Sequence, residues 1–489
     1  MGQTRSERRG ARPTAPSPVS PTPRASRRAR MAGLLPALLV ALTLAVTPAP
    51  PSVQGEARAA ASGEPLTLIR AVELARQNSP AIREAQANRD AAHSARREAW
   101  LYHLPAIEAK EIAVRTDSPA DVFGMQLMQE RFSFPAFTMS DPNQPAPFDN
   151  VTTELSASLP LFTGWSLESG IKQAGKMAKA ADAVQAHTDR AVELGVSQAF
   201  LGCRLADRFL ELAERARATT ARHVEQAQAF FDVGMLVESD LLQAKVKLAE
   251  MDETVIRARN GARLARAGLA RAMGLAQDRV FELAEPGPFA DPLPASYDDA
   301  LAQAMTVRRD LQAVDRKVEA AGAGVTRARG ELFPQVGLMA KYALNDDRLF
   351  GAHGSSYTVG AMASWKVWNW GQTFTRVARS ESEHRAAQEA RRGYRQQVEF
   401  EVRQSWQGVE EARARLEVGA RGVEAAEKAL TILEDRFGQG VARITDLLDA
   451  ETMAHQARVR EVQAHTDLEL AARTLSFAVG GSAVPEAIR

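Results

Sequence analysis

The chain has almost no cysteine, few aromatic residues and no excess of charge of either sign. Its 489 residues include one cysteine, Cys203, which excludes an intramolecular disulfide framework and a cysteine-based zinc site. Lysine and arginine number 61 and aspartate and glutamate number 60, so no net field draws the chain onto nucleic acid. We therefore expect no nucleic acid among its partners.

Sequence motifs of catalytic and cofactor sites are also missing. The eight histidines show no H-x-x-x-H or H-E-x-x-H spacing, and the chain has no Walker loop. Glu381 and His384 form one E-x-x-H pair, whereas a di-iron bundle requires two. We expect a protein that is not an enzyme and that holds no metal and no cofactor.

Residues 1–61 have the character of a leader followed by a signal peptide. Residues 1–30 are rich in proline, serine and arginine, an apolar run covers 34–46, and small residues fill 57–61. The run is shorter than the roughly 20 residues that span a bilayer. This order of segments predicts export with cleavage near 59–61.

The rest of the chain is a tandem repeat. Residues 231–244 align with 437–450, so that Gly234 corresponds to Gly440 at an offset of 206. Upstream the offset rises to 229, because the first copy carries 23 extra residues between its two strands. The predicted domains are a first copy at 62–285, a linker at 286–296, a second copy at 297–481 and a tail at 482–489.

Each copy is expected to run helix, strand, strand, long helix, helix. Alternation of apolar and polar residues predicts strands at about 150–161, 335–345 and 356–367. A further strand is expected at about 105–116, where the alternation is poor, with an inserted loop at 117–149. No proline occurs at 161–285 or at 335–484, and the abundant Ala, Glu, Arg and Leu favour very long helices. These are expected to break at Gly234 and Gly440, and Ser239 and Thr445 are the expected N-caps of the helices that follow. The fold class is therefore mostly α, with a small contribution to a membrane β-barrel.

Four such strands cannot close a barrel by themselves. Membrane barrels begin at about eight strands, and an open edge in lipid leaves costly unpaired backbone groups. Three copies would supply twelve strands. Aromatic residues at the strand–helix junctions suit a membrane-interface girdle, although junction core packing is an alternative. These residues are Trp100, Tyr102, Phe162, Trp165, Trp365, Trp368 and Trp370.

Two motifs give the chain a resemblance to the TolC family of outer-membrane efflux and secretion ducts. They are the turn F-x-x-G-x(5)-D-L-L-x-A, present twice, and the sequence Leu-Phe-Thr-Gly at 161–164. The resemblance implies a homotrimer with a twelve-stranded barrel in outer-membrane lipid and a helical tunnel in the periplasm. It also implies a periplasmic adaptor and an inner-membrane pump that supplies the energy. The second junction, Trp-Asn-Trp-Gly at 368–371, departs from the family pattern.

The same resemblance assigns roles to residues at the two helical turns. Asp446 and Asp449 are similar to paired aspartates at the periplasmic entrance, and Asp240, Ser239 and Phe437 to residues that hold that end shut. Asp446 also suits a helix N-terminus, where acidic residues interact favourably with the helix dipole. The expected adaptor contacts are Val233, Gly234, Met235, Gln439, Gly440 and Val441.

A second class of function remains open on the residues alone. A soluble periplasmic coiled-coil adaptor or structural protein would also be exported and rich in helix formers. The alternating strands and junction tryptophans favour the passive exit duct, since a coiled coil requires neither. Whether drugs, metal ions or proteins pass, and whether the 117–149 insertion faces outward or plugs the barrel, is left undecided by the sequence.

Overall fold

The computed structural model describes residues 65–139, 141–285, 287, 289 and 292–484, so the predicted leader and signal peptide lie outside the described residues. The described chain is mostly helical, with one four-stranded sheet in the order β1-β2-β3-β4. The predicted mostly α fold with a small β contribution is confirmed. The strands are β1 (Ala106–Thr116), β2 (Phe148–Phe162), β3 (Gln335–Asp346) and β4 (Ser355–Ser364). The helices are α3 (Leu68–Asn78), α4 (Pro80–Leu101), α5 (Pro119–Met128), α6 (Phe134–Met139), α7 (Ser166–Asp232), α8 (Glu238–Ala272), α9 (Tyr297–Val307), α10 (Arg309–Gly330), α11 (Gln372–Gly438) and α12 (Ile444–Ala478).

The described chain divides into two compact units. The smaller comprises 109–155 and 342–357, and the larger comprises the remaining described residues. Helices α5 and α6 fill the insertion of the first copy, within the smaller unit. Strand β4 ends at Ser364, three residues before the predicted end.

Buried polar side chains hold the smaller unit together. Gln129, which follows α5, donates to the carbonyl oxygen of Asp149 and to Asn150 Oδ1, both at 2.8 Å. Asn150 and Thr152 on β2 donate to Asn345 Oδ1 on β3 at 3.2 and 2.8 Å. Buried polar groups need such partners, so this network fixes the end of α5 against the two strands.

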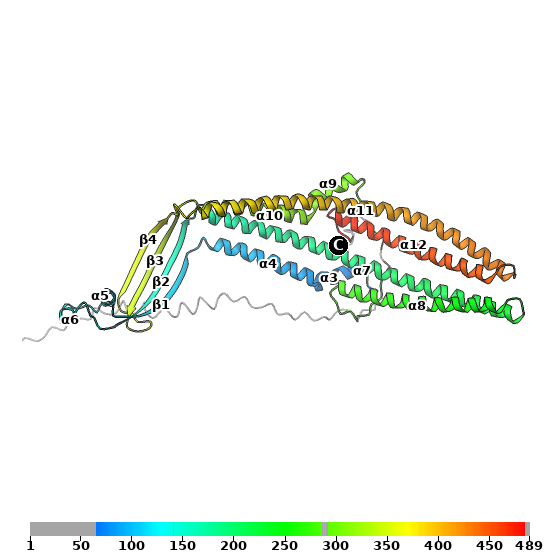
Figure 1. Cartoon of the computed structure of the whole chain (residues 1–489), viewed down its shortest axis with the longest axis horizontal. Coiled ribbons are helices and arrows are strands. Elements are labelled where there is room, and N and C mark those ends of the chain that lie inside the picture. Colours follow the sequence, from blue (N-terminus) through cyan, green and yellow to red (C-terminus); the bar gives the residue numbers. More distant parts are fainter. Residues whose placement is uncertain (1–64, 140, 286, 288, 290–291, 485–489) are drawn as a thin grey trace, which may run out of the picture. The chain divides into compact units, whose positions relative to one another are not determined.

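Two helix pairs of equal length dominate the larger unit (Figure 1). Helices α7 and α11 each have 67 residues, and α8 and α12 each have 35. At about 1.5 Å per residue the longer helices extend about 100 Å. Each long helix packs against the helix that follows it, and α7 also packs against α4, α10 and α12. We refer to α7–α8 and α11–α12 as the first and second hairpins.

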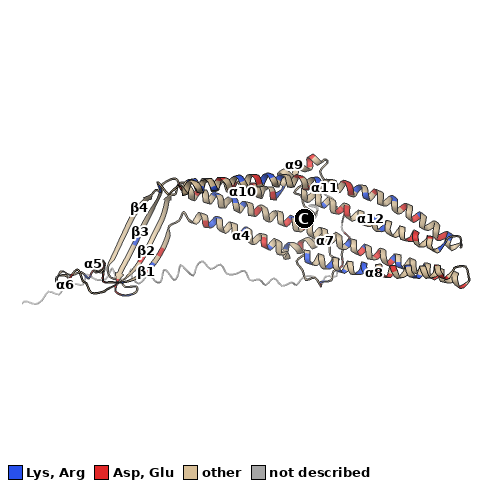
Figure 2. Ribbon diagram, viewed as in Figure 1, with Lys and Arg blue, Asp and Glu red and all other residues tan. Residues whose placement is uncertain are grey.

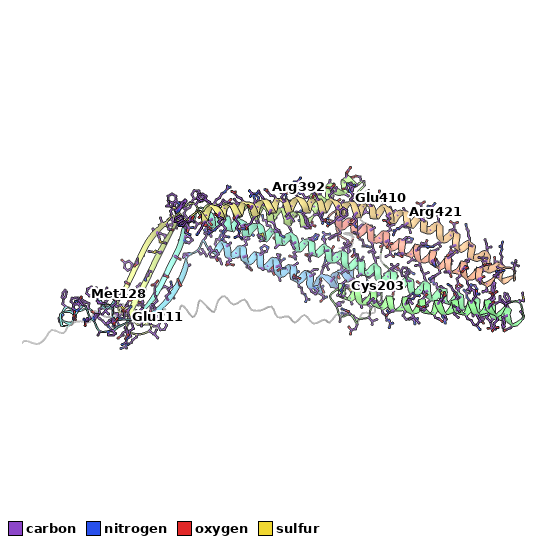
Figure 3. All side chains as sticks on the ribbon, in the orientation of Figure 1. Glu111, Met128, Cys203, Arg392, Glu410 and Arg421 are labelled. Atoms are coloured by element: carbon purple, nitrogen blue, oxygen red, sulfur yellow. The ribbon has the colours of Figure 1, made fainter. Side chains whose placement is uncertain are left out.

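Small and aliphatic side chains form the core of the larger unit. One cluster joins α3, α7 and the end of α8, and it includes Val72, Phe200, Cys203 and Leu269, each at most 5% exposed. Cys203 lies well inside the helical region (Figure 3). Burial raises the pKa of its thiol to about 11, so this cysteine is an unreactive packing residue.

Charges of both signs alternate along the helices, and no long stretch of one sign is visible (Figure 2). Exposed pairs such as Glu411–Arg415 and Glu424–Lys428 on α11 are spaced one helical turn apart. Exposed pairs of this kind contribute only a few tenths of a kcal/mol each. They keep the helix surface hydrated, and the buried clusters stabilise the fold.

Candidate functional site

The two helical turns have the same backbone. At the end of α7 the amide of Gly234 donates to Phe231 O at 2.9 Å and that of Met235 donates to Phe230 O at 2.8 Å. The amides of Gly440 and Val441 make the equivalent bonds at the end of α11. Gly234 and Gly440 have φ values of 78° and 75°, the left-handed conformation that ends a helix in a Schellman motif. Glycine is required here because other residues are strained in this conformation.

The second helix of each hairpin begins without a side-chain cap. The pattern favours Ser239 and Thr445 as N-caps, but α8 and α12 begin earlier and the N-cap positions are Val237 and Arg443. That expectation is wrong, because the tight turn leaves too few residues before the helix starts. Asp240 and Asp446 instead lie in the first turn, where acidic side chains interact favourably with the helix dipole.

Asp446 and Asp449 lie on the exposed face of α12, three residues apart. Leu447 and Leu448 between them are 0% and 6% exposed and belong to the core. Within the described residues, neither carboxylate takes part in a hydrogen bond or an ion pair. Both carboxylates are therefore hydrated and free to interact with ions.

An apolar cluster lies beneath both turns and joins the two hairpins. Phe437, which is 2% exposed, packs against Phe230 with ring centroids 5.4 Å apart. Leu241 on α8 and Ile444 on α12 belong to the same cluster. Phe437 therefore fastens the hairpins by apolar contact, since a phenyl ring has no hydrogen-bonding group. Ser239 is exposed, and its hydroxyl lies 3.4 Å from Asp240 Oδ1.

The predicted adaptor-contact residues are exposed at the turns. Val233, Met235 and Val441 expose 69%, 64% and 75% of their surface. Gln439 and the two glycines beside them are also exposed. Apolar side chains this exposed beside a buried core mark a surface suited to contact with a partner.

The two strand–helix junctions share one backbone although their sequences differ. Thr163 Oγ1 accepts from the amide of Leu167 at 3.1 Å, and Asn369 Oδ1 accepts from the amide of Thr373, 206 residues later, at 3.4 Å. Two consecutive left-handed residues follow each of these two side chains, first as Gly-Trp at 164–165 and then as Trp-Gly at 370–371. The departure from the family pattern at the second junction therefore leaves the local fold intact.

Close packing explains why glycine comes first at one junction only. A Cβ atom on Gly164 would lie 2.2 Å from Gly330 O, at the end of α10. Trp370, at the matching position, is 87% exposed and meets no such restriction. The order of glycine and tryptophan therefore follows from how closely each junction approaches α10.

Most of the junction aromatics are largely exposed in the single chain. Trp100, Trp165, Trp365 and Trp370 are each more than half exposed. Trp365 Nε1 donates to Leu332 O at 3.0 Å, which fixes this indole at the surface. Tyr102 and Trp368 are exposed to a similar degree and Phe162 is partly exposed. Amphipathic rings placed in this way suit a membrane interface.

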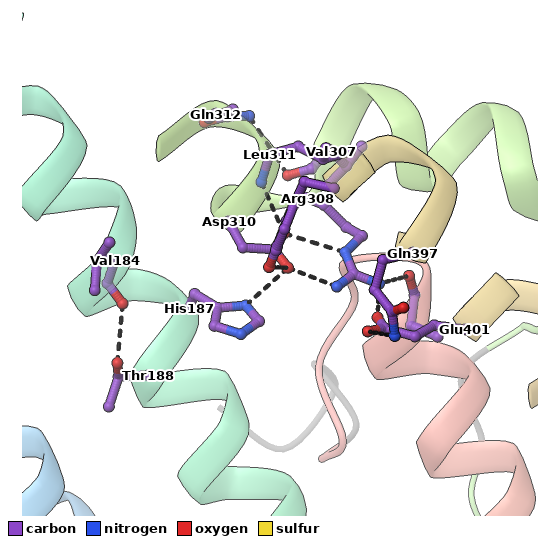
Figure 4. Close-up of polar contacts among 12 residues, drawn as sticks. Val184, His187, Thr188, Val307, Arg308, Asp310, Leu311, Gln312, Gln397 and Glu401 are labelled. Atoms are coloured by element: carbon purple, nitrogen blue, oxygen red, sulfur yellow. Dashed lines mark hydrogen bonds and ion pairs between the residues drawn. The ribbon is translucent and has the colours of Figure 1, made fainter. Parts of the chain in front are cut away.

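Two buried polar clusters were missed by the sequence reasoning. The first surrounds Arg308, which is 4% exposed (Figure 4). Its guanidinium donates to Asp310 at 2.5 Å, pairs with Glu401 at 2.8 Å and donates to Ala478 O at 3.2 Å. Burial works against the charge on Asp310, but the hydrogen bonds and charge of Arg308 outweigh it and lower the pKa of Asp310. The second cluster surrounds Glu451, a carboxylate in a run of apolar core positions on α12. A carboxyl side chain within this apolar run was the only sign of the second cluster in the local sequence.

Among the residues that the structure describes, no group of three or more His, Cys, Asp or Glu side chains is placed to hold a metal ion.

No helix in the described part of the chain is both long and apolar enough to cross a membrane.

The sequence profile of one protein family, "Outer membrane efflux protein", matches residues 71–275 and 300–481. The chain belongs to this family, which is a family of outer-membrane efflux proteins and not of enzymes. The sequence-based predictions of a TolC-type protein and of the outer membrane as its location are confirmed.

Individual relatives agree with this assignment. The outer membrane efflux protein BepC of Brucella suis biovar 1 (strain 1330) is 26% identical over 272 residues. These residues are 55% of this chain and 59% of that relative, so the match spans about three fifths of the relative's length.

Solved structures share the fold. VceC, an outer membrane protein of Vibrio cholerae, is similar with a TM-score of 0.70 and 20% identity, over 85% of this chain and 97% of VceC. MtrE, an outer membrane channel of Neisseria gonorrhoeae, is similar with a TM-score of 0.70 and 18% identity, over 85% of this chain and 89% of MtrE.

Proposed function

We propose that the protein is the passive outer-membrane exit duct of a tripartite efflux or type I secretion system. Three copies would contribute twelve strands to one barrel in outer-membrane lipid. The hairpins would enclose a periplasmic tunnel that an inner-membrane pump reaches through a periplasmic adaptor. The pump would supply the energy and select the substrate, since the sequence carries no nucleotide-binding motif.

One observation carries the proposal for the entrance. Asp446 and Asp449 expose unpaired carboxylates on the first two turns of α12, beside a glycine turn and above an apolar core. Three-fold symmetry would bring six carboxylates around one axis. A narrow ring of carboxylates concentrates cations and repels anions. The exposed apolar residues Val233, Met235 and Val441 supply the neighbouring surface for the adaptor.

Single-channel recording tests the entrance. We expect the detergent-purified protein to form small cation-selective channels that multivalent cations block from the periplasmic side. Asp446→Asn with Asp449→Asn removes the carboxylates and nearly preserves side-chain size, so block and cation preference should be lost. The charge-matched control is Asp298→Asn with Asp299→Asn, on the first turn of α9.

Each result has one meaning. Channels with unchanged block would move the entrance away from α12 but keep the duct. No channels from a protein that is monomeric and water-soluble without detergent would refute the duct and favour the adaptor-like alternative. Light scattering of the detergent complex measures the expected trimer.

A further inference from the structure

Glu451 lies at the seam between the two hairpins, close to their turns. We define the seam as Thr220, His223 and Ala227 on α7 together with Glu434 and Phe437 on α11 and Glu451 on α12. Glu451 is 7% exposed and Thr220 is 1% exposed. Their side chains meet at 3.1 Å, although the residues are 231 positions apart in the chain. A carboxyl group that is buried here holds the first hairpin against the second.

The hydrogen bonds at Thr220 depend on whether Glu451 carries a proton. Thr220 Oγ1 lies 3.0 Å from Ala216 O and 3.1 Å from Glu451 Oε1. A hydroxyl has one proton to donate, so it cannot serve both acceptors at full strength. When Glu451 is protonated it can donate to Thr220, and Thr220 can then donate to Ala216 O. When Glu451 is ionised, Thr220 can donate to it, but the seam then holds a buried negative charge that no described residue neutralises by a direct ion pair, and burial of an unpaired charge is costly.

The other groups around Glu451 do not form a direct ion pair with it. His223 is 8% exposed, and in the described structure its Nε2 has no hydrogen-bond partner and lies 3.8 Å from Glu434 Oε1. Lys247 is engaged with Glu250 at 3.0 Å. The charged and titratable side chains around Glu451 are Arg222 and His223 on α7, Lys247 on α8, Glu434 on α11 and His455 on α12.

We propose that Glu451 is a proton-operated fastener of the seam, which holds the hairpins together when it is protonated and loosens them when it ionises. The inference rests on the proposed function only for its consequence, that loosening the seam favours opening of the periplasmic end. The sensing itself is a property of the hairpins.

The direction of the effect follows from the titration of the buried groups. Burial, opposed in part by the Thr220 hydrogen bond, raises the pKa of Glu451 from 4.5 to about 7. The seam therefore binds a proton that a hydrated Glu451 would release, and it weakens as the pH rises from 4.5 to about 7. Burial lowers the pKa of His223 and of His455 below 6.5, so these imidazoles weaken the seam as the pH falls below 6.5. Replacing Glu451 alone therefore isolates its contribution to the pH dependence of the seam.

Thiol labelling measures the seam without any need for ion conduction. Ala227 is 0% exposed within the cluster beneath the turns, so a thiol introduced by Ala227→Cys reacts with a maleimide only when the seam opens. Native Cys203, which is 0% exposed in the separate cluster with α3, reports global unfolding in the same molecule. The full-length protein in detergent is labelled with and without Glu451→Gln at each pH, so the intrinsic pH dependence of the thiol cancels.

We expect labelling at pH about 8 to be at least about tenfold slower with Glu451→Gln, since one pKa unit corresponds to tenfold. At pH about 5 the two proteins should differ by less than about fivefold, and Cys203 should be unaffected. Glu434→Gln, which removes a partly exposed carboxylate from the same seam, should not produce this pH-dependent difference.

Three outcomes would overturn the inference. A ratio that is the same at both pH values would mean that Glu451 does not sense protons. Parallel labelling of Cys203 would mean that the chain unfolds globally. The same pattern with Glu434→Gln would assign the proton to another carboxyl group. If the protein forms no channels at all, the labelling result still decides the role of Glu451.

Discussion

The two copies have the same backbone but different chemistry where the short helix, α3 or α9, meets the next helix, α4 or α10. In the first copy Ser79 ends α3 with φ −61° and ψ 123°, and in the second Arg308 ends α9 with φ −58° and ψ 125°. The amide of Ser79 donates to Ala75 O, and that of Arg308 donates to Ala304 O. Both side chains are buried, at 5% and 4% exposed, yet only Arg308 brings a charge into the core. The same backbone conformation thus accommodates a buried neutral serine in one copy and a buried charged arginine in the other.

We call the junction of α3 with α4 the first joint and the junction of α9 with α10 the second joint. The difference between them shows which neighbouring groups each joint requires. Ser79 precedes Pro80, whose ring favours the start of a helix and needs no amide partner. Arg308 draws in Asp310 and Glu401, and Tyr394 adds a hydrogen bond to Asp310 at 2.8 Å. Burial and this hydrogen bond raise the pKa of Tyr394 to about 12. The second joint therefore depends on a complete ion network and the first does not.

Replacing Arg308 should give the largest difference in stability between the two joints. Arg308→Ala leaves Asp310 as an unpaired buried carboxylate, so we expect the free energy of unfolding to fall by about 3–5 kcal/mol. Ser79→Ala, at the matching position, should cost about 1 kcal/mol or less. Thermal unfolding of the detergent-solubilised protein, followed by circular dichroism, measures both. Equal losses would show that the ion network is no more important than the serine.

Acid should produce the next largest difference, because only the second joint depends on an ionised buried carboxylate. The pKa of Asp310 lies below its ordinary value of 3.8, so the stability that its ionised form contributes is present above that pH and is lost as the pH falls through the lowered value. With Asp310→Asn the melting temperature should start lower and lose less between pH about 5 and 3. Asp298→Asn, at an exposed position, should retain the steep wild-type dependence. A wild-type profile in the Asp310 variant would contradict the pairing with Arg308.

The glycine turns offer a smaller and more local test. Gly234→Ala and Gly440→Ala each force a side chain into the left-handed conformation, at a cost of about 1–2 kcal/mol. A Cβ atom on Gly234 meets nothing within 4 Å, whereas on Gly440 it would lie 3.3 Å from Met235 Cε. We therefore expect Gly440→Ala to cost slightly more. Amide exchange in the hairpin ends measures the loss, and unchanged exchange in both variants would argue against the shared motif.

The junction tryptophans should give small effects of opposite sign. Trp370→Gly removes a strained left-handed residue that is 87% exposed, so the protein should gain up to about 1 kcal/mol. Trp165 packs edge-on against Phe162 and Phe333, with centroids 5.1 and 5.4 Å away. Trp165→Gly relieves the same left-handed strain, but the loss of both contacts should outweigh it and destabilise the protein by up to about 1 kcal/mol. Denaturation in one detergent compares the two, and the same sign in both variants would contradict this account.

Most of the architecture could be predicted because it depends on local patterns. The lack of proline at 161–285 and 335–484, the abundance of helix formers and the period-two alternation are features of consecutive residues. They predicted a mostly α fold with four strands. Gly234 and Gly440 also predicted the positions of the two turns, because the left-handed conformation that ends a helix strongly favours glycine. The helix starts after these turns were wrongly assigned to Ser239 and Thr445, because the position of an N-cap depends on how tightly the preceding turn closes.

Only the tertiary structure decided which distant side chains meet. Thr220 and Glu451, Arg308 and Glu401, and Asn150 and Asn345 are each brought together from separate elements. Such pairs leave no periodic signal in the sequence, because their spacing reflects the packing of whole helices and strands. The sequence by itself determined the repeat, the elements and the turns through local backbone preferences. The packing of the hairpins decided where charge is buried, since burial is set by neighbours that lie far apart in the chain.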